Sequence, residues 1–262
     1  MRDDDLAEIA AQLSDPRVAE WLAAIRPPVD PAQAREVLAV ARDPLQTVRL
    51  LELSGRVIGG FCIGPRFWYW LDPRHQGGGH MTCALHAALG ACFARDGPPL
   101  IATCREDNAT SVALLHRLGF SPRPVTRRLF FHGAGSAMTC RDHVMTPEQW
   151  HFLNPPRRQA GKLILRPARQ EDLATVQQLL EGETPAPPWP RPGADAVRAF
   201  LERHRFRGWA DPALWIVETD ERRAIAMELS TAGSGDTHLR PARLEAQLRP
   251  AVRAALSDPG GA

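Results

Sequence analysis

The chain has 262 residues, a formal net charge of +2 and 44% hydrophobic residues. Its length suggests one or two domains, and its hydrophobic content excludes global disorder. A charge this close to neutral argues against a broad basic surface for nucleic acid. No apolar run reaches the roughly 18 residues of a bilayer span. We therefore expect neither a nucleic-acid partner nor a membrane partner.

The cysteines indicate a reducing compartment. Their number is odd and no C-x-x-C pair occurs among Cys62, Cys83, Cys92, Cys104 and Cys140. This pattern is typical of reduced thiols rather than of a disulfide framework or a zinc site. Because no signal-peptide pattern opens the sequence either, we expect a cytoplasmic protein.

The first segment alternates helical and strand patterns. Helical periodicity opens it at residues 6–13, 18–25 and, after an Asp30-Pro31 cap, 31–41. Strand patterns follow at 47–53 and 56–63, which form a predicted hairpin, and at 67–71. The remaining elements are a helix over 82–95, a strand over 100–104, a helix over 111–118 and a hairpin of 125–132 with 137–145. This order predicts an α+β fold with a mixed, mostly antiparallel sheet flanked by helices.

A proline- and glycine-rich stretch at residues 154–161 is typical of a linker, because such residues break regular elements. We place a first domain at 1–153 and a second at 162–262. The second partly repeats the first, with a helix pattern at 172–180 and a strand–turn–strand pattern over 214–231. Only residues 232–240 and a helix over 241–256 follow, so this tandem copy is predicted to be incomplete.

A strand pattern at residues 162–166 precedes the first helix of the second copy, whereas the first copy has no equivalent. Three explanations remain open: a start upstream of Met1, pairing of residues 162–166 with that sheet edge, or pairing by a partner chain. Since an uncovered strand edge invites association, we expect a homodimer.

The most informative stretch joins a strand to a helix through Gln76-Gly77-Gly78-Gly79-His80-Met81. Glycines allow a ligand close to the backbone. The first turn of a helix presents unpaired N–H groups and a partial positive charge. Such a turn suits a pyrophosphate, although a plain flexible turn has the same composition.

This stretch resembles the acetyl-CoA loop of the GNAT N-acetyltransferase superfamily, whose pattern is Gln/Arg-x-x-Gly-x-Gly/Ala. Gln76 and the three glycines fit, whereas Met81 occupies the final small-residue position. The run Gly79-His80-Met81-Thr82-x-Ala84-Leu85 is similar to the Gly-Tyr-Met-Thr-Glu-Ala-Leu form of one branch. That branch includes the ribosomal-protein alanine N-acetyltransferases.

A second block, from Arg105 to Phe120, resembles the family's later motif. In that motif an asparagine follows a strand, here Asn108, and Leu-Gly-Phe ends the next helix. Gly119 stands where a helix C-cap glycine belongs. The resemblance covers residues 2–152, and the second segment resembles a degenerate half-domain of the same family.

The resemblance implies that acetyl-CoA is the co-substrate. Backbone N–H groups of the glycine loop would hold its pyrophosphate, and the strand ending at Leu71 would pair with its pantetheine arm. Asn108 would contact that arm near the thioester, while Arg74 or Arg117 would meet the 3′-phosphate. The implied binding set is Leu71, Gln76, Gly77, Gly78, Gly79, His80, Met81, Thr82 and Asn108.

The implied reaction is direct attack of an amine on the thioester, after which the leaving thiolate needs a proton or a hydrogen bond. Many family members place a tyrosine acid where this chain has Leu115. Ser111 is therefore our candidate hydroxyl and Glu106 our candidate proton relay, although a helix-surface serine and a surface carboxylate are the plain alternatives. Any tyrosine acid would have to be Tyr69, the only tyrosine. The histidines at 75, 80 and 86 lack metal-site spacing, so we assign no metal.

These features predict an acetyl-CoA-dependent N-acetyltransferase that acts on a primary amine of a protein N-terminus or a small molecule. The alternative is a weak or inactive acetyl-CoA-binding pseudoenzyme that serves as a sensor or interaction module. Leu115, Met81 and the absent first strand favour that alternative. A nicotinamide dehydrogenase is a poorer third hypothesis, because no G-x-G-x-x-G opens a βαβ unit. No second glycine loop follows Lys162, so we expect one acetyl-CoA per chain.

Overall fold

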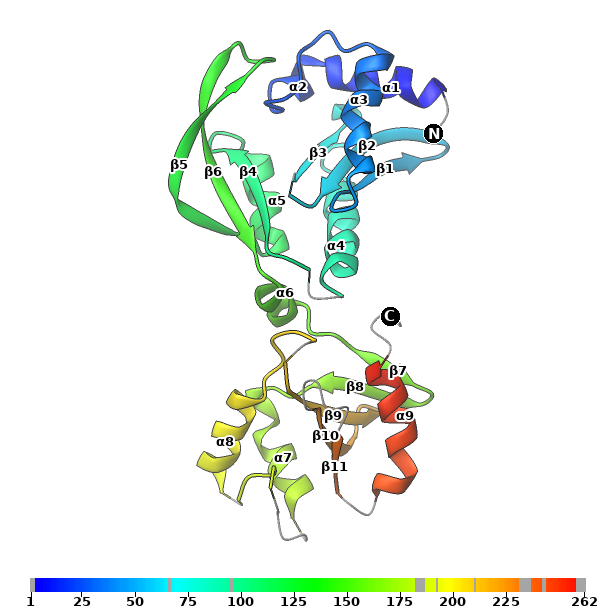
Figure 1. Ribbon diagram of the computed structural model, residues 1–262, viewed down its shortest axis with the longest axis vertical. Coiled ribbons are helices and arrows are strands. Elements are labelled where there is room, and N and C mark those ends of the chain that lie inside the picture. The colour runs from blue at the N-terminus through cyan, green and yellow to red at the C-terminus, as the bar shows by residue number, and fades with distance from the viewer. Residues whose placement is uncertain are drawn as a thin grey trace. The chain divides into compact units, whose positions relative to one another are not determined.

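The computed structural model describes residues 3–65, 67–94, 97–181, 187–191, 193–209, 211–230, 237–241 and 244–257 (Figure 1). The chain divides into two compact units. Unit 1 comprises Met1–Cys92 and Pro98–Thr146, and unit 2 comprises Phe93–Gly97 and Pro147–Ala262.

Unit 1 combines helices with two antiparallel sheets. Its helices are α1 (Asp3–Ser14), α2 (Pro16–Ala19), α3 (Pro31–Ala39), α4 (His80–Phe93) and α5 (Ala109–Leu118), with 3-10 turns η1 (Val40–Arg42) and η2 (Pro73–His75). Its strands are β1 (Thr47–Leu53), β2 (Arg56–Ile63), β3 (Trp68–Leu71), β4 (Leu100–Arg105), β5 (Ser121–Phe131) and β6 (Ser136–Met145). The sheet orders are β1-β2-β3 and β4-β6-β5, and every pairing is antiparallel. The predicted α+β class and both predicted hairpins are confirmed.

The core of unit 1 anchors the strand that leads into the glycine loop. Leu6, Ile9 and Leu13 lie at helical spacing on α1 and pack in one buried cluster with Val57 of β2 and Trp70 of β3. This packing fixes the end of β3 against α1, which positions the loop that follows.

Helix α4 begins at His80, two residues before the predicted start, because the helix opens directly after the last glycine of the loop. The end of the prediction, residues 95–96, lies outside the described residues. Met81, Leu85 and Leu89 recur every four residues along α4 and are all buried. The first turn of the helix is thereby held in the core.

Unit 2 contains one five-stranded sheet between helices. Its strands are β7 (Arg158–Ala160), β8 (Leu163–Pro167), β9 (Ala213–Thr219), β10 (Ala224–Ser230) and β11 (Thr237–Arg240), in the order β11-β10-β9-β8-β7. Its helices are α6 (Pro147–Leu153), α7 (Leu173–Leu180), α8 (Ala194–Arg203) and α9 (Glu245–Ser257), with the 3-10 turn η3 (Gln170–Asp172).

Strand alternation divides the core of unit 2 into two layers. Leu214 and Ile216 of β9 share a cluster with residues of α7 and α8. Trp215 and Val217 face the other side, with Leu248 and Val252 of α9 nearby in the second cluster. The sheet is therefore covered on both faces.

The element order of unit 2 repeats that of the first part of unit 1. Helices α7 and α8 precede the antiparallel strands β9-β10-β11 and then α9, as α1 and α3 precede β1-β2-β3 and then α4 (Figure 1). The sequence between β11 and α9 reads Pro241-Ala242-Arg243-Leu244 and contains no glycine. The Gly233-Ser234-Gly235 run lies outside the described residues. That unit 2 is a degenerate half-domain stays a prediction.

The structure changes the picture of the boundary region at two points. Residues 158–160 of the predicted linker form β7, because Gly161 at φ +61° makes the turn of a β7–β8 hairpin instead of ending the ordered structure. Strand β8, predicted over residues 162–166, pairs with β7 and β9, which excludes one of the three explanations left open for the missing first strand, the pairing of these residues with the first sheet.

Among the described helices, none combines the length and apolarity required to cross a bilayer. All five cysteines are free thiols.

Candidate active site

Strand β3 presents its aromatic residues to two different sides, because successive side chains of a strand alternate. Trp68 and Trp70 pack with the α1 cluster, with ring centroids 5.6 Å apart. The Trp70 indole N–H donates to Gln12 Oε1 at 3.0 Å, and Gln12 Nε2 donates to the Val57 carbonyl at 2.6 Å. Tyr69 is left on the opposite face, where the site lies.

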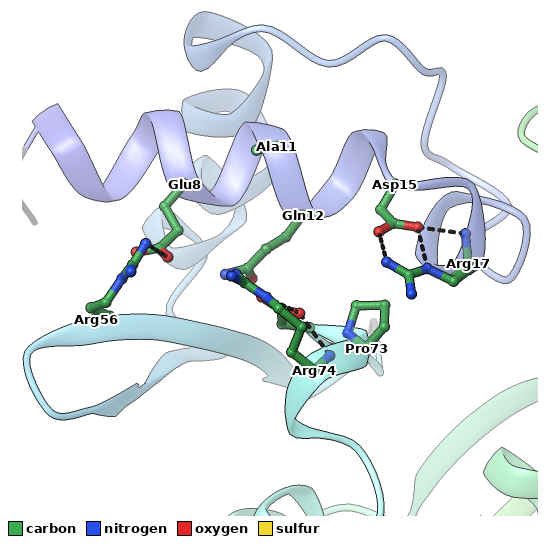
Figure 2. A pocket seen from close by; sticks show the side chains of 9 residues that line it. Glu8, Ala11, Gln12, Asp15, Arg17, Arg56, Pro73 and Arg74 are labelled. Atoms are coloured by element: carbon green, nitrogen blue, oxygen red, sulfur yellow. Dashed lines mark hydrogen bonds and ion pairs between the residues drawn. The ribbon is translucent and has the colours of Figure 1, made fainter.

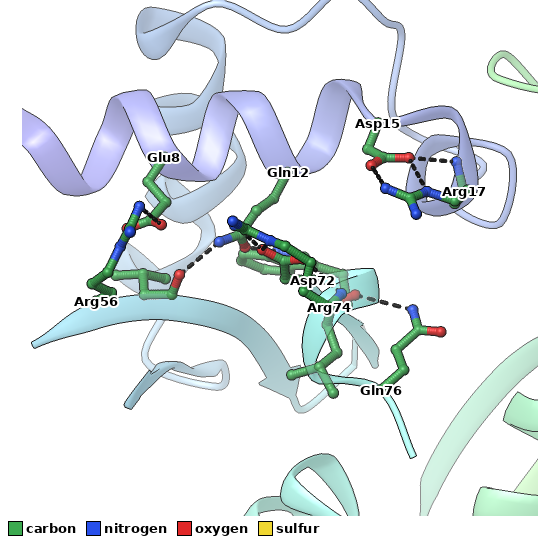
Figure 3. A network of polar contacts seen from close by, with 11 residues as sticks. Glu8, Gln12, Asp15, Arg17, Arg56, Asp72, Arg74 and Gln76 are labelled. Atoms are coloured by element: carbon green, nitrogen blue, oxygen red, sulfur yellow. Dashed lines mark hydrogen bonds and ion pairs between the residues drawn. The ribbon is translucent and has the colours of Figure 1, made fainter. Parts of the chain in front are cut away.

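A buried carboxylate fixes the turn after β3 (Figure 3). Asp72 is 4% exposed and accepts hydrogen bonds from the Arg74 backbone N–H at 2.9 Å and from the Arg74 guanidinium. The Asp72 N–H donates to the Ile58 carbonyl at 2.8 Å. Hydrogen bonds from Arg74 outweigh burial and keep the pKa of Asp72 below its usual value. Asp72 therefore fixes the turn that leads from β3 into the glycine loop.

A cavity of about 310 Å³ lies beside this turn, between α1 and the start of β2 (Figure 2). Three arginines and three acids line it as pairs: Arg17 with Asp15, Arg56 with Glu8, and Arg74 with Asp72. Because each guanidinium group is paired with one carboxylate, these charges cancel. Arg74, one of the two predicted 3′-phosphate contacts, is therefore engaged in the turn itself.

The glycine loop has the conformation that its sequence predicts. Gly77 and Gly79 adopt left-handed φ values of +82° and +78°, and a Cβ at either position would meet nothing within 4 Å. An L-residue there would pay about 1–2 kcal/mol for the left-handed backbone. At Gly78, a Cβ would come within 3.0 Å of the His80 imidazole. The backbone of the loop is therefore left open at two of its three glycines.

The loop leads directly into the N-terminus of α4. The Cys83 N–H donates to the Gly79 carbonyl at 3.0 Å, which closes the first helical turn. Met81 is only 5% exposed, so its side chain belongs to the core and leaves its backbone as the part that meets the loop. This packing explains how a methionine is accommodated at a position where the general pattern has a small residue.

The two sheets of unit 1 end at the strands that flank the site. Strand β3 is the last strand of β1-β2-β3, and β4 is the first of β4-β6-β5. Each thus has one edge outside its own sheet's ladder, which suits pairing of an extended ligand with β3. The Leu71 carbonyl at this edge accepts a hydrogen bond from Gln76 Nε2 at 3.2 Å (Figure 3).

The N-terminus of α5 gathers three candidate groups. Asn108 caps the helix, with its Oδ1 accepting from the Ser111 N–H at 3.0 Å. The Ser111 hydroxyl is hydrogen-bonded to the Tyr69 hydroxyl of β3. Burial raises the pKa of Tyr69 well above its ordinary value of 10.0, and burial likewise raises the pKa of the neighbouring Cys104 thiol. Gly119, in the left-handed conformation, ends the helix as predicted.

Glu106 belongs to a separate ion pair. Its Oε1 accepts from Arg141 Nε at 2.9 Å and from the terminal nitrogen of the same guanidinium at 2.5 Å. The structure thus joins Glu106 to β6, whereas it joins Ser111 to β3. Leu115, at the position of the family's tyrosine, is 1% exposed and fills the core.

The contact between Tyr69 and Ser111 was not predicted from the sequence. The signals that could have found it are the uniqueness of Tyr69 and strand alternation, which turns it away from its tryptophan neighbours. No cluster of three His, Cys, Asp or Glu side chains suited to a metal occurs within the described ranges.

The comparisons with known proteins agree with this geometry. Residues 1–121 match the family described as "Acetyltransferase (GNAT) domain". Over these residues the chain is similar to the GNAT acetyltransferases, a family of acyltransferase enzymes, which confirms the predicted resemblance.

The solved structures that match the chain cover little more than half of it. RimJ of Mycobacterium smegmatis, in complex with CoA-disulfide, is 24% identical over 56% of this chain and 79% of its own, with a TM-score of 0.48. The ribosomal-protein-S5-alanine acetyltransferase of Vibrio fischeri is 18% identical over 57% and 92%, with a TM-score of 0.46. Spermidine N-acetyltransferase of Vibrio cholerae, with CoA and spermine, is 15% identical over 57% and 94%, with a TM-score of 0.48. No curated protein sequence matches the chain.

Proposed function

We propose that this chain transfers an acetyl group from acetyl-CoA to a primary amine by direct attack. The observation that carries the proposal is the glycine loop, in which two left-handed glycines lead straight into the N-terminus of α4. Open backbone, unpaired N–H groups and the helix dipole together suit a diphosphate. The family match of residues 1–121 supports acetyl-CoA as its carrier.

The site residues divide the work as follows. N–H groups of Gly77, Gly79 and Met81 bind the diphosphate, with Gln76, Gly78, His80 and Thr82 around it. The free edge of β3 up to Leu71 pairs with the pantetheine arm, and Asn108 lies beside that arm at the start of α5. Ser111 then donates a hydrogen bond to the leaving thiolate, and Glu106 relays the proton that the amine loses.

The chemistry favours weakly basic amines. The nitrogen must be neutral to attack, and a lysine amine with a pKa of about 10.4 costs roughly 4.6 kcal/mol to deprotonate at pH 7. An α-amino group with a pKa near 8 costs only about 1 kcal/mol by the same arithmetic. Glu106 accepts two hydrogen bonds from Arg141, so we propose that it relays the proton through water and that the acceptor amine loses its proton readily. A protein N-terminus or a weakly basic small amine is the acceptor class that fits.

Calorimetry of the full chain with acetyl-CoA tests the binding half of the proposal. We expect one site per chain, because the second copy has Pro241-Ala242-Arg243-Leu244 in place of the glycine loop. Gly79→Asp should abolish binding by placing a side chain and a negative charge at the diphosphate. Two sites per chain, or full binding by Gly79→Asp, would contradict the proposal.

A second candidate function is an acetyl-CoA sensor without turnover, favoured by Leu115 in the core and by the Glu106–Arg141 pair. Thiol release from acetyl-CoA with a panel of amines separates the two. Sustained amine-dependent release supports the transferase and excludes the sensor. Tight binding without release with any α-amino peptide, polyamine or lysine peptide supports the sensor.

A further inference from the structure

The only tyrosine of the chain stands beside the candidate hydroxyl. Tyr69 and Ser111 are 42 residues apart in sequence, on β3 and on the first turn of α5, yet their hydroxyl groups are hydrogen-bonded. The Tyr69 ring is held edge-on by Phe67, at a centroid distance of 6.1 Å, and Phe67 in turn contacts Phe120 at 5.4 Å. The phenol is thus fixed in direction by its packing.

The Ser111 backbone is fixed as well. Its N–H is bonded to the Asn108 cap, so the serine cannot rotate with a fraying helix end. A hydroxyl has one hydrogen and two acceptor sites. If Tyr69 donates to Ser111 Oγ, the serine hydrogen is available for another acceptor, whereas a serine that donates to Tyr69 has none to offer.

We propose that Tyr69 is the positioning residue of Ser111: the phenol donates to Ser111 Oγ and directs the serine hydrogen toward the sulfur of bound CoA. This inference rests on the proposed acetyl transfer. In that reaction nitrogen bonds to the acyl carbon, the C–S bond breaks, and sulfur keeps the electron pair. The proton that nitrogen loses converts the thiolate to the thiol, so Ser111 and Tyr69 end the cycle protonated.

The environment of Tyr69 supports this direction of the bond. Burial raises its pKa, so the phenol keeps its proton through the neutral and mildly alkaline range and remains a donor. The uncharged thiol of Cys104, the other neighbour of Ser111, does not compete as a strong acceptor. Leu115 replaces the tyrosine that serves as the acid in many family members. In this chain Tyr69 on β3 would instead support Ser111 on α5 in that role.

Kinetics of three variants test the inference. Ser111→Ala should lower kcat roughly a hundredfold, and Tyr69→Phe, which removes one hydroxyl and keeps the ring, roughly tenfold. The double variant should be no slower than Ser111→Ala, because Tyr69 acts only through Ser111. The KM for acetyl-CoA should change less than threefold. Ser136→Ala, at the exposed start of β6, is the matched control and should behave as wild type.

The single tyrosine permits a sharper test. Biosynthetic replacement of tyrosine by a ring-fluorinated tyrosine alters residue 69 alone and lowers the pKa of its phenol with little change of shape. Burial keeps the phenol protonated over the working pH range, so the more acidic phenol is a stronger donor to Ser111 Oγ. Fluorination should therefore raise kcat in the wild-type background but not in Ser111→Ala, which a purely structural tyrosine would not cause. A kcat unchanged by fluorination, a Tyr69→Phe variant with wild-type kcat, or additive losses in the double variant would overturn the inference.

Failure of the proposed function is distinguishable from failure of this inference. If wild type releases no thiol with any amine, the transferase proposal fails. The fluorine NMR signal of residue 69 then tests separately whether Tyr69 contacts Ser111 and responds to the sulfur of bound CoA. That signal should shift in Ser111→Ala and should differ between CoA and desulfo-CoA, which lacks the sulfur. Identical signals with the two ligands would overturn the inference even in an active enzyme.

Discussion

Replacing Gly79 by alanine separates the conformation of the loop from its contact with ligand. Gly79 has φ +78°, and a Cβ at this position meets no atom within 4 Å. The substitution therefore causes no clash in the free protein, and its cost is the left-handed backbone, about 1–2 kcal/mol. In a domain of this size such a cost corresponds to a fall in Tm of roughly 2–8 °C.

Gly55 in the β1–β2 turn provides a matched control. It has the same φ of +78°, and a Cβ at this position would also meet no atom within 4 Å. Gly55→Ala and Gly79→Ala should therefore lower Tm by similar amounts in the absence of ligand. Thermal melts of the two variants at one pH measure this baseline.

Only the Gly79 variant should lose affinity for CoA. Alanine keeps the N–H of residue 79, but its Cβ would occupy the open space in which the diphosphate is proposed to lie. Displacing the diphosphate from one N–H loses a hydrogen bond worth about 1.5–3 kcal/mol, which raises Kd roughly tenfold or more. Calorimetric titration of both variants with CoA makes the comparison. Equal affinities for Gly79→Ala and wild type, or an equal loss in Gly55→Ala, would refute the role of the loop.

Three further predictions concern residues around the site and in unit 2. Asp72→Asn should lower Tm at pH 7 and by progressively less as the pH falls from 3.8 through the lowered pKa of Asp72, because the carboxylate loses its stabilising effect as it is protonated in the folded state. Arg166→Met removes the cation shared by Asp172 and Glu218 and should cost about 3 kcal/mol or more in urea unfolding, with unchanged CoA affinity. Burial chiefly lowers the pKa of His143, so wild type should lose stability as pH falls below 6.5, and His143→Gln should lose less in parallel melts.

Local signals predicted most of unit 1 correctly. The β1–β2 hairpin follows from Ser54-Gly55, and both residues adopt the positive φ that a tight turn requires, 51° and 78°. The glycine loop and the Gly119 cap could also be predicted from the sequence, because positions with a left-handed backbone favour glycine.

Contacts between segments far apart along the chain could not be predicted from the sequence. Glu106 directly follows β4 and Arg141 lies on β6, so their pairing depends on the β4–β6 register, in which Arg105 is opposite Cys140. The hydrogen bond between Tyr69 and Ser111 likewise depends on how α5 packs beside β3. Both contacts join segments far apart along the chain, and single-sequence periodicity carries no information on such pairings.

In unit 2, prolines obscured two elements. Pro155 and Pro156 suggested a linker, yet the three residues from Arg158 retain their N–H groups and pair with β8. Helix α8 received no prediction beside the proline-rich residues 185–192, although Val197, Phe200 and Leu201 follow helical spacing and are buried. The nearby prolines, which break helices, hid the amphipathic pattern of α8.

A crystal structure of the full chain with CoA would test the central claim most directly. The account predicts the diphosphate within hydrogen-bond distance of the N–H groups of Gly77, Gly79 and Met81, with the thiol end directed toward Ser111. A diphosphate bound anywhere else on the chain would contradict it.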